Sequence, residues 1–288
     1  KENGVVTTGN DGIEDDLAGE DSSGIFIYRN GAIFEYTNTS INGFASETYF
    51  PDVTSEIPIF RISINGNLNN MNNFVVNGIL QVNNNLSFGN STIPIDIRNG
   101  VTGDGDLTFN VPFTLSGDDI TFGGSGTFNM GGDDLNFSSG TTITLTSDKE
   151  IQNGSLTFSS GSVVEAASFK ITDGTANNLT VNVNSGNTLK VTGADGLVSG
   201  GDPVFEAGTL NLGTEVNYEF NGTATQSTNF STFGVTEAGS VTINNTFGVN
   251  LTEAITINTG IILTAGIFNT DAGTRSEERR VGKECRSR

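Results

Sequence analysis

The sequence predicts an all-β protein of the β-solenoid class: a right-handed parallel β-helix with coils of about 21 residues. One observation behind this is that short runs rich in Val, Ile, Thr and Phe alternate apolar with polar residues, as half-buried strands do. A second is that Gly-Asp, Asn-Gly and Gly-Gly turns separate these runs, using many of the 38 glycines. No stretch shows the period of an amphipathic helix.

A third observation is a phrase that recurs between residues 103 and 161. Each copy is an acidic or polar turn followed by an apolar–polar–apolar strand. The four copies are Gly105–Phe109 (GDLTF), Gly117–Phe122 (GDDITF), Gly132–Phe137 (GDDLNF) and Asn153–Phe158 (NGSLTF). One such strand cannot bury its apolar face alone, so its repetition indicates a stack of similar units.

The spacing of apolar residues indicates the coil length. Three pairs of leucines lie 21 residues apart: Leu86 and Leu107, Leu135 and Leu156, Leu189 and Leu210. The shorter steps on either side of Ile120 are expected either to lead from one face of a coil to another or to mark irregular coils. Coils stacked at about 4.8 Å would align Leu and Phe in columns inside and Thr, Asn and Ser outside. The alternative is an array of antiparallel β-sandwich modules, which also has short strands and Asn-Gly turns.

We expect the chain to consist of four segments. Residues 1–23 are acidic and weakly patterned, as in a linker or the frayed end of a preceding module. Residues 24–203 form a first β-helix module, and residues 204–274 form a similar module that is cut short. Residues 275–288 (RSEERRVGKECRSR) are similar to the translation of a common sequencing adapter, and we expect them to be non-native.

The two modules are inferred from a pattern near the start of each. An aromatic–Glu–aromatic strand, Phe34–Tyr36 or Tyr218–Phe220, leads to an Asn/Thr/Gly turn and then to successive strands. Tyr218–Gln226 (YEFNGTATQ) and Thr259–Thr270 (TGIILTAGIFNT) resemble the β-strand repeats of large secreted surface proteins of Bacteroidota, and Pro58–Gly89 resembles them less closely. The resemblance implies a β-helical architecture, export by a type IX secretion route and a C-terminal sorting domain.

Composition limits the chemistry that the chain can perform. The formal net charge is −20, and it becomes −23 without residues 275–288, which hold six of the 13 basic and three of the 33 acidic side chains. This acidity argues against nucleic acids and membranes as partners, because phosphates would be repelled. No apolar run is long enough for membrane insertion. His is absent and Cys285 is the only cysteine, so Ser–His, His–metal and disulfide chemistry are not expected.

Paired acidic residues are the candidate functional residues. Turn aspartates commonly hydrogen-bond their own backbone, which is the favoured interpretation. The alternatives are weak Ca²⁺ binding and paired acid–base catalysis, for which carboxylates are the appropriate groups. The candidate Ca²⁺ ligands are Asp104, Asp106, Asp118, Asp119, Asp133 and Asp134. No other cofactor and no catalytic residue is expected.

Two further features have structural interpretations. The basic residues of the strand region are expected to point outward, where charge discourages aggregation: Arg29, Arg61, Arg98, Lys149, Lys170 and Lys190. Thr141–Thr146 (TTITLT) places alternate threonines on one face. Repeated over many coils, such a ladder could bind ice.

The sequence thus predicts a non-enzymatic, extracellular or cell-surface β-solenoid, a stalk or adhesin-like segment of a larger protein. Its partners would be extracellular glycans or cell-surface components. The alternative is a carbohydrate-binding or degenerate polysaccharide-lyase-like β-helix with Ca²⁺ at the Asp-rich turns. An ice-binding solenoid is a more remote alternative.

Overall fold

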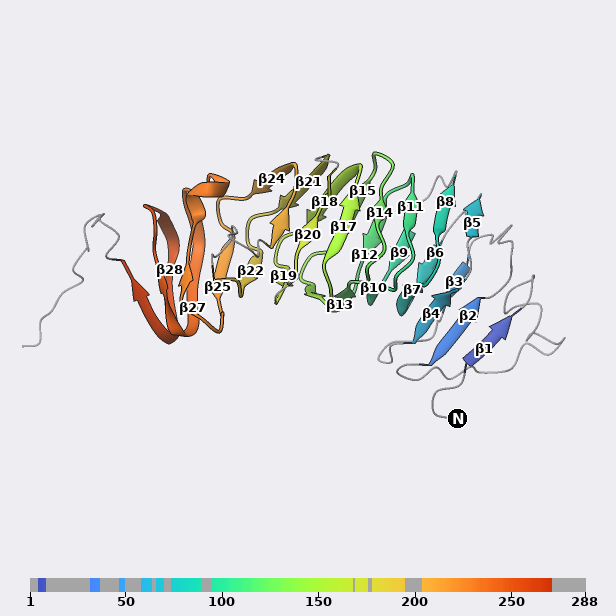
Figure 1. The fold of residues 1–288 in the computed structure, drawn as a ribbon, viewed down its shortest axis with the longest axis horizontal. Helices are drawn as coiled ribbons and strands as arrows, with labels where there is room; N and C mark the ends of the chain where they lie inside the picture. Colours follow the sequence, from blue (N-terminus) through green and yellow to red (C-terminus); the bar gives the residue numbers. More distant parts are fainter. Residues whose placement is uncertain are drawn as a thin grey trace, which may run out of the picture.

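The protein winds as a β-solenoid in the computed structural model, which describes residues 5–8, 32–36, 47–49, 58–63, 66–69, 74–89, 95–167, 169–175, 178–194 and 204–270. Every strand pairing in these residues is parallel. The predicted parallel β-helix is therefore confirmed, and the antiparallel sandwich array is wrong. Figure 1 shows one elongated stack, with β1 near one end and β28 near the other.

The strands form three sheets that run along the stack. The first sheet has 13 strands: β1 (Val5–Thr8), β2 (Ile33–Tyr36), β4 (Ile59–Ile62), β7 (Ile79–Val82), β10 (Gly100–Thr102), β13 (Asp119–Phe122), β16 (Thr142–Leu145), β19 (Val163–Glu165), β22 (Thr188–Val191), β25 (Asn217–Phe220), β26 (Gln226–Ser227), β27 (Glu237–Asn250) and β28 (Thr256–Asn269). The second has seven: β5 (Gly66–Asn69), β8 (Leu86–Gly89), β11 (Leu107–Phe109), β14 (Phe128–Asn129), β17 (Lys149–Gln152), β20 (Ile171–Thr172) and β23 (Phe205–Glu206). The third has eight: β3 (Glu47–Tyr49), β6 (Phe74–Val76), β9 (Ile95–Ile97), β12 (Phe113–Leu115), β15 (Asp134–Phe137), β18 (Gly154–Phe158), β21 (Leu179–Val183) and β24 (Thr209–Leu212). A short 3₁₀ helix, η1 (Phe230–Phe233), follows β26.

Each central coil visits the first, second and third sheets in that order, as β10, β11 and β12 do. Leu86 pairs with Leu107, and Leu135 pairs with Leu156, so the 21-residue coil is confirmed. The predicted one-coil spacing between Leu189 and Leu210 is wrong, because Leu189 pairs with Tyr218. A longer connection between β22 and β23 lengthens that coil to 29 residues.

The recurring phrase lies on all three sheets. Its first copy ends in β11 of the second sheet, and its second ends in β13 of the first sheet. The last two copies end in β15 and β18, which pair directly in the third sheet. The prediction that the steps around Ile120 lead between faces is therefore confirmed.

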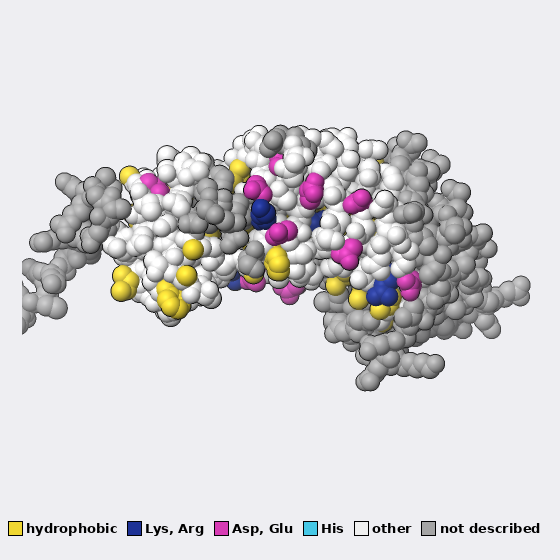
Figure 2. Space-filling view, in the orientation of Figure 1, with side chains coloured by type: hydrophobic (Ala, Val, Ile, Leu, Met, Phe, Trp, Pro, Cys, Tyr) yellow, Lys and Arg dark blue, Asp and Glu magenta, His cyan; other side chains and the backbone are white. Residues whose placement is uncertain are grey.

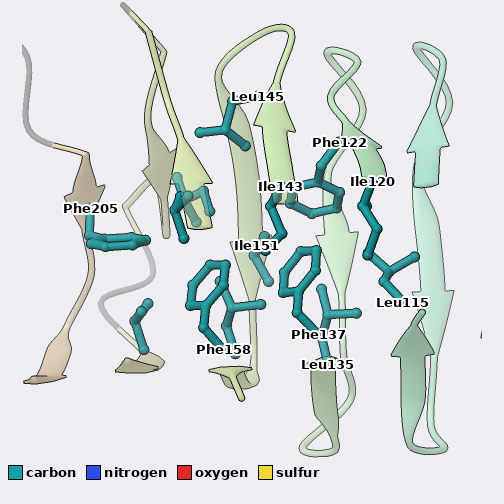
Figure 3. Packing of buried hydrophobic residues seen from close by; sticks show 14 of the residues in the cluster. Leu115, Ile120, Phe122, Leu135, Phe137, Ile143, Leu145, Ile151, Phe158 and Phe205 are labelled. Atoms are coloured by element: carbon teal, nitrogen blue, oxygen red, sulfur yellow. The ribbon is translucent and has the colours of Figure 1, made fainter. Parts of the chain in front are cut away.

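Inward side chains form a continuous apolar core along the stack (Figure 3). Phe137 and Phe158 lie one above the other, with ring centroids 4.8 Å apart and an interplanar angle of 2°. Phe122 meets Phe137 edge-on at 5.4 Å, and Phe205 continues the row at 5.7 Å from Phe158. These phenylalanines recur at inward positions because the period-two strands stack in register.

The stack continues across residue 203, where the two modules were expected to meet. Strands β20, β21 and β22 pair with β23, β24 and β25 on the other side of this position. The division into modules stays a prediction. Of residues 1–23 the structure describes only β1, and residues 275–288 lie outside the described residues.

A buried amide network organises the last coils. Gln226 Nε2 donates to the carbonyl oxygens of Val191 and Gly193 at 2.8 and 2.9 Å. Its Oε1 accepts from the backbone N–H of Gly222 at 2.8 Å and from Nδ2 of Asn245 at 2.9 Å. The glutamine that ends the YEFNGTATQ motif therefore ties the turn after β25 to both neighbouring coils.

Replacing Gln226 with leucine should lower the free energy of unfolding by about 2–3 kcal/mol, because four buried hydrogen bonds are lost while the volume is nearly kept. Urea denaturation would measure the loss. Thr223→Ala in the same turn is the matched control, since Thr223 is exposed, and its effect should stay within about 0.5 kcal/mol. Equal effects of the two substitutions would contradict a structural role for the network.

Candidate functional site

The three aspartate pairs lie at three different corners of the coil. Asp104 and Asp106 lie between β10 and β11, where the chain passes from the first to the second sheet. The pair Asp118/Asp119 lies where β13 begins in the first sheet, and Asp133/Asp134 lies where β15 begins in the third. The structure therefore does not bring the pairs together. Figure 2 likewise shows acidic side chains spread over the visible face.

No metal centre is formed by the described residues, in the sense that no three His, Cys, Asp or Glu side chains there are grouped closely enough to hold an ion. Asp118 and Asp119 are both exposed to solvent. Calcium binding at the six aspartates stays a prediction.

Asp104 and Asp106 bind the next coil rather than their own turn. Asp104 Oδ1 accepts from the backbone N–H and from the hydroxyl of Ser125, at 3.3 and 2.9 Å. Asp106 Oδ1 accepts from the backbone N–H of Thr127 at 2.8 Å. The favoured interpretation, a bond to the residue's own backbone, is thus corrected for these two. Their partners lie 21 residues on, because stacking places the next coil's corner directly above.

The same corner holds a buried lysine. Lys149 was expected to point outward, but its side chain has no exposed surface. Its backbone pairs with Ile171 in β20 of the next coil. On the other side, the register of the strands aligns Lys149 with Gly126 of the preceding coil and Gly105 of the coil before that. A Cβ at Gly126 would lie 1.9 Å from the carbonyl oxygen of Gly105, so glycine is required where these corners approach. The two glycines thus allow the corners of successive coils to stack closely beneath Lys149.

The Lys149 ammonium group is surrounded by the protein's own polar and aromatic groups. Nζ donates to the carbonyl oxygens of Gly126 and Gly124, at 2.5 and 3.4 Å, and lies 3.8 Å from the centroid of the Phe128 ring. Burial lowers the pKa of Lys149 from its ordinary value of 10.5 to about 7, while the charges of Asp106 and Asp104 oppose this change. Near neutral pH this amine can therefore accept or release a proton, but its contacts are to backbone and ring atoms.

Other basic side chains do lie outward, in ion pairs. Lys170 Nζ lies 2.7 Å from Glu206 Oε2, and this hydrogen bond lowers the pKa of Glu206. Lys190 pairs with Glu165 of the preceding coil. These pairs neutralise charge along the rod, but at such exposure each contributes little stability.

Threonines do not form a continuous ladder in the described strands. In the column through Thr121 and Thr144, the next two residues are Glu165 and Lys190. On the third sheet Thr180 pairs with Thr209 on one side, but it pairs with Ser155 on the other. Threonines thus stand next to each other in at most two successive paired strands, and charged or other polar residues follow.

A shallow groove lies beside β24, between Leu210–Thr214 and Gly234–Glu237. Among the described strands none pairs with the second edge of β24, so the third sheet ends there. Leu210 and Leu212 are consequently half-buried, whereas the inward residues of β21 are buried. The sequence did not reveal this groove, because Leu210-Asn211-Leu212 has the same alternation as a covered strand.

A scan of protein-family models finds no match to the chain, and neither do searches of curated proteins and of solved structures. No helix in the described part of the chain is long and apolar enough to cross a membrane.

Proposed function

We propose that this chain is a non-enzymatic, extracellular structural segment, a stalk or adhesin-like rod of a larger surface protein. The observation that carries the proposal is that outward side chains bond to one another from coil to coil. On the third sheet Asn211 Nδ2 donates to Asn182 Oδ1 at 2.9 Å, and Asn182 Nδ2 donates to Thr157 Oγ1 at 3.3 Å. Because these side-chain hydrogen bonds link each coil to the next, they stiffen the rod.

Charge and composition support an extracellular rod. The net charge of −20 keeps such a stack soluble and opposes association along its sides. The resemblance of Tyr218–Gln226 and Thr259–Thr270 to repeats of secreted Bacteroidota surface proteins points the same way. Cell-surface glycans are the partners we propose, bound weakly and at many coils.

A second candidate function is calcium-dependent carbohydrate binding. It is favoured by Asp118 and Asp119, whose exposed carboxylates stand at the start of β13. Adjacent carboxylates with open solvent are suited to Ca²⁺, which takes oxygen ligands and several waters.

A glycan array and a polysaccharide-lyase assay, each with Ca²⁺ and with EDTA, would separate the two functions. We expect no lyase products, and glycan signals that do not change with EDTA or in the Asp118→Ala/Asp119→Ala variant. The double substitution Asp133→Ala/Asp134→Ala is the matched control at another corner. Calcium-dependent binding or cleavage lost only in the Asp118/Asp119 variant would establish the second function in place of the first.

A further inference from the structure

Strand β24 has an open edge at a point where the described chain continues. It pairs with β21 on one side, and no described strand pairs with its other side. The chain goes on from β24 into β25, β27 and β28, which Figure 1 shows farther along the stack. The coil that follows β24 is therefore present, and the edge stays open because this coil takes another path.

The 3₁₀ helix η1 explains why the following coil leaves β24 uncovered. Central coils place a strand in the third sheet before they return to the first, whereas this coil has η1 between β26 and β27. Phe230 of η1 is fully buried, and its ring centroid lies 4.8 Å from that of Tyr218 and 5.9 Å from that of Phe220. Because η1 packs into the core in this way, a groove remains between β24 and Gly234–Glu237.

The backbone along this groove is suited to pairing with an extended segment. The N–H of Gly213 donates to the carbonyl oxygen of Val183, at the end of β21, at 2.8 Å. Backbone groups of successive residues in a strand point to alternate sides. Those of Leu210 and Leu212 therefore face the open side, where no described strand pairs with them. A segment lying along the edge would form hydrogen bonds with these groups.

The side chains of the groove favour a segment with apolar residues at alternate positions. Leu210 pairs with Val181 and Leu212 pairs with Val183. Both valines are buried, whereas the two leucines are only half-buried. A strand added in register would place its inward side chains over the leucines, and its outward side chains would lie in solvent. Apolar–polar–apolar alternation therefore fits the groove.

The rim of the groove is acidic. Glu237 belongs to the lining, and Glu215 follows Thr214, which also lines the groove. Both glutamates are exposed, and neither forms an ion pair with a described residue. A basic side chain would therefore be attracted to this rim, and an acidic segment would be repelled.

We propose that this groove binds an extended peptide segment of a partner protein, which joins the edge of β24 as a further strand and carries Lys or Arg beside alternating apolar residues. The open backbone groups favour the extended conformation, the half-buried leucines favour the apolar residues, and the two glutamates favour the positive charge. A second copy of this chain fits less well, because its net charge is −20. The inference does not depend on the proposed surface role.

Fluorescence anisotropy with labelled hexapeptides would test the binding to the full chain. The probe is Lys-Val-Thr-Val-Thr-Lys, which combines the alternation with two positive charges. We expect it to bind with a dissociation constant below about 1 mM. Glu-Val-Thr-Val-Thr-Glu should bind at least about tenfold more weakly, because its charges are repelled by the rim. A copy of the probe that is N-methylated at its four inner residues should not bind, because it cannot donate backbone hydrogen bonds.

Substitutions in the groove test where the peptide binds, with circular dichroism as the check on the fold. Leu212→Lys places a charge on the apolar floor and should weaken the probe at least about tenfold. Glu237→Gln should weaken it about threefold, as expected for an exposed ion pair. Glu219→Gln is the matched control, because Glu219 lies on the outward face of β25 and accepts from Asn244, and it should leave the affinity unchanged.

The open edge of β28 is the competing place for a strand to add, and Ile262→Lys would block it. This substitution should leave the affinity for the probe unchanged. Loss of binding in Ile262→Lys but not in Leu212→Lys would place the peptide on β28 and overturn the proposal. Absence of binding at millimolar peptide, equal binding of the acidic or N-methylated peptide, or an affinity unchanged by Leu212→Lys and Glu237→Gln would each overturn it as well.

Discussion

Replacing Phe137 with alanine should lower the free energy of unfolding by about 3–5 kcal/mol, as other large-to-small changes at buried aromatic residues do. Phe137 is fully buried and lies at the centre of the aromatic row. Its ring stacks on Phe158 at 4.8 Å and meets Phe122 edge-on at 5.4 Å, so the substitution removes two ring contacts and leaves a cavity between coils. Urea denaturation followed by circular dichroism would measure the loss.

The position of the loss is as informative as its size. Coils of a solenoid contact mainly their neighbours, so the damage should remain near the substituted coil. Hydrogen exchange should accelerate most in β12, β15 and β18, which pair in register around Phe137, and least in β4 and β7.

The neighbouring Asn136 is the control for the loss at Phe137. It lies on the same strand but on the outward face, and Asn136→Ala should change stability by no more than about 0.5 kcal/mol. A loss at Phe137 no greater than at Asn136 would contradict the inward assignment of the phenylalanines.

The phenylalanine row could be predicted because its cause is local. Apolar–polar–apolar alternation in Leu135-Asn136-Phe137 determines which side chains share a face, and equal spacing to Leu156 determines which strand lies above. The spacing from Leu189 to Leu210 looks the same and means something else. The longer connection between β22 and β23 extends this coil to 29 residues. Leu189 therefore pairs with Tyr218, and Leu210 lies on another sheet, where it pairs with Val181.

The contacts at the corner that holds Asp104, Asp106 and Lys149 could be predicted only in part. Lys149 was expected to point outward because it is charged, but by period two it shares the inward face of its strand with Ile151. The buried position is satisfied by the carbonyl oxygens of Gly124 and Gly126, which lie 25 and 23 residues earlier in the chain and accept hydrogen bonds from Nζ. Their position beneath Lys149 becomes known only with the register of the coils. The bonds from Asp104 and Asp106 to the next coil were missed for the same reason.

The protein should become more stable as the pH rises from about 7 towards 10, because of Lys149. Burial lowers the pKa of this lysine to about 7 in the folded chain, whereas its ordinary value is 10.5. Between these values the unfolded chain holds a proton on Lys149 that the folded chain has released. Stability rises with pH wherever the unfolded state binds more protons, here by up to about 1.4 kcal/mol per pH unit.

Lys149→Met tests this because methionine has a similar length and no charge. The variant also loses the contacts to the carbonyl oxygens of Gly124 and Gly126, so the slope of stability against pH is the diagnostic quantity rather than stability at one pH. Urea titrations at several pH values between 7 and 9.5 should show a rising free energy of unfolding for the unsubstituted chain and a flat one for Lys149→Met. Lys190→Met is the control, since Lys190 lies outward beside Glu165, and it should keep the rise.

The chosen pH window separates Lys149 from the other group whose pKa is shifted in the alkaline range. Burial raises the pKa of Tyr218, so this tyrosine destabilises the folded chain only above about pH 10, where the unfolded chain would ionise. The charges of Asp106 and Asp104 act on Lys149 by favouring its protonated form. Asp106→Asn should therefore lower the pKa of Lys149 further and extend the rise to lower pH. A slope that persists in Lys149→Met would show that another group causes it and that Lys149 titrates like a solvated amine.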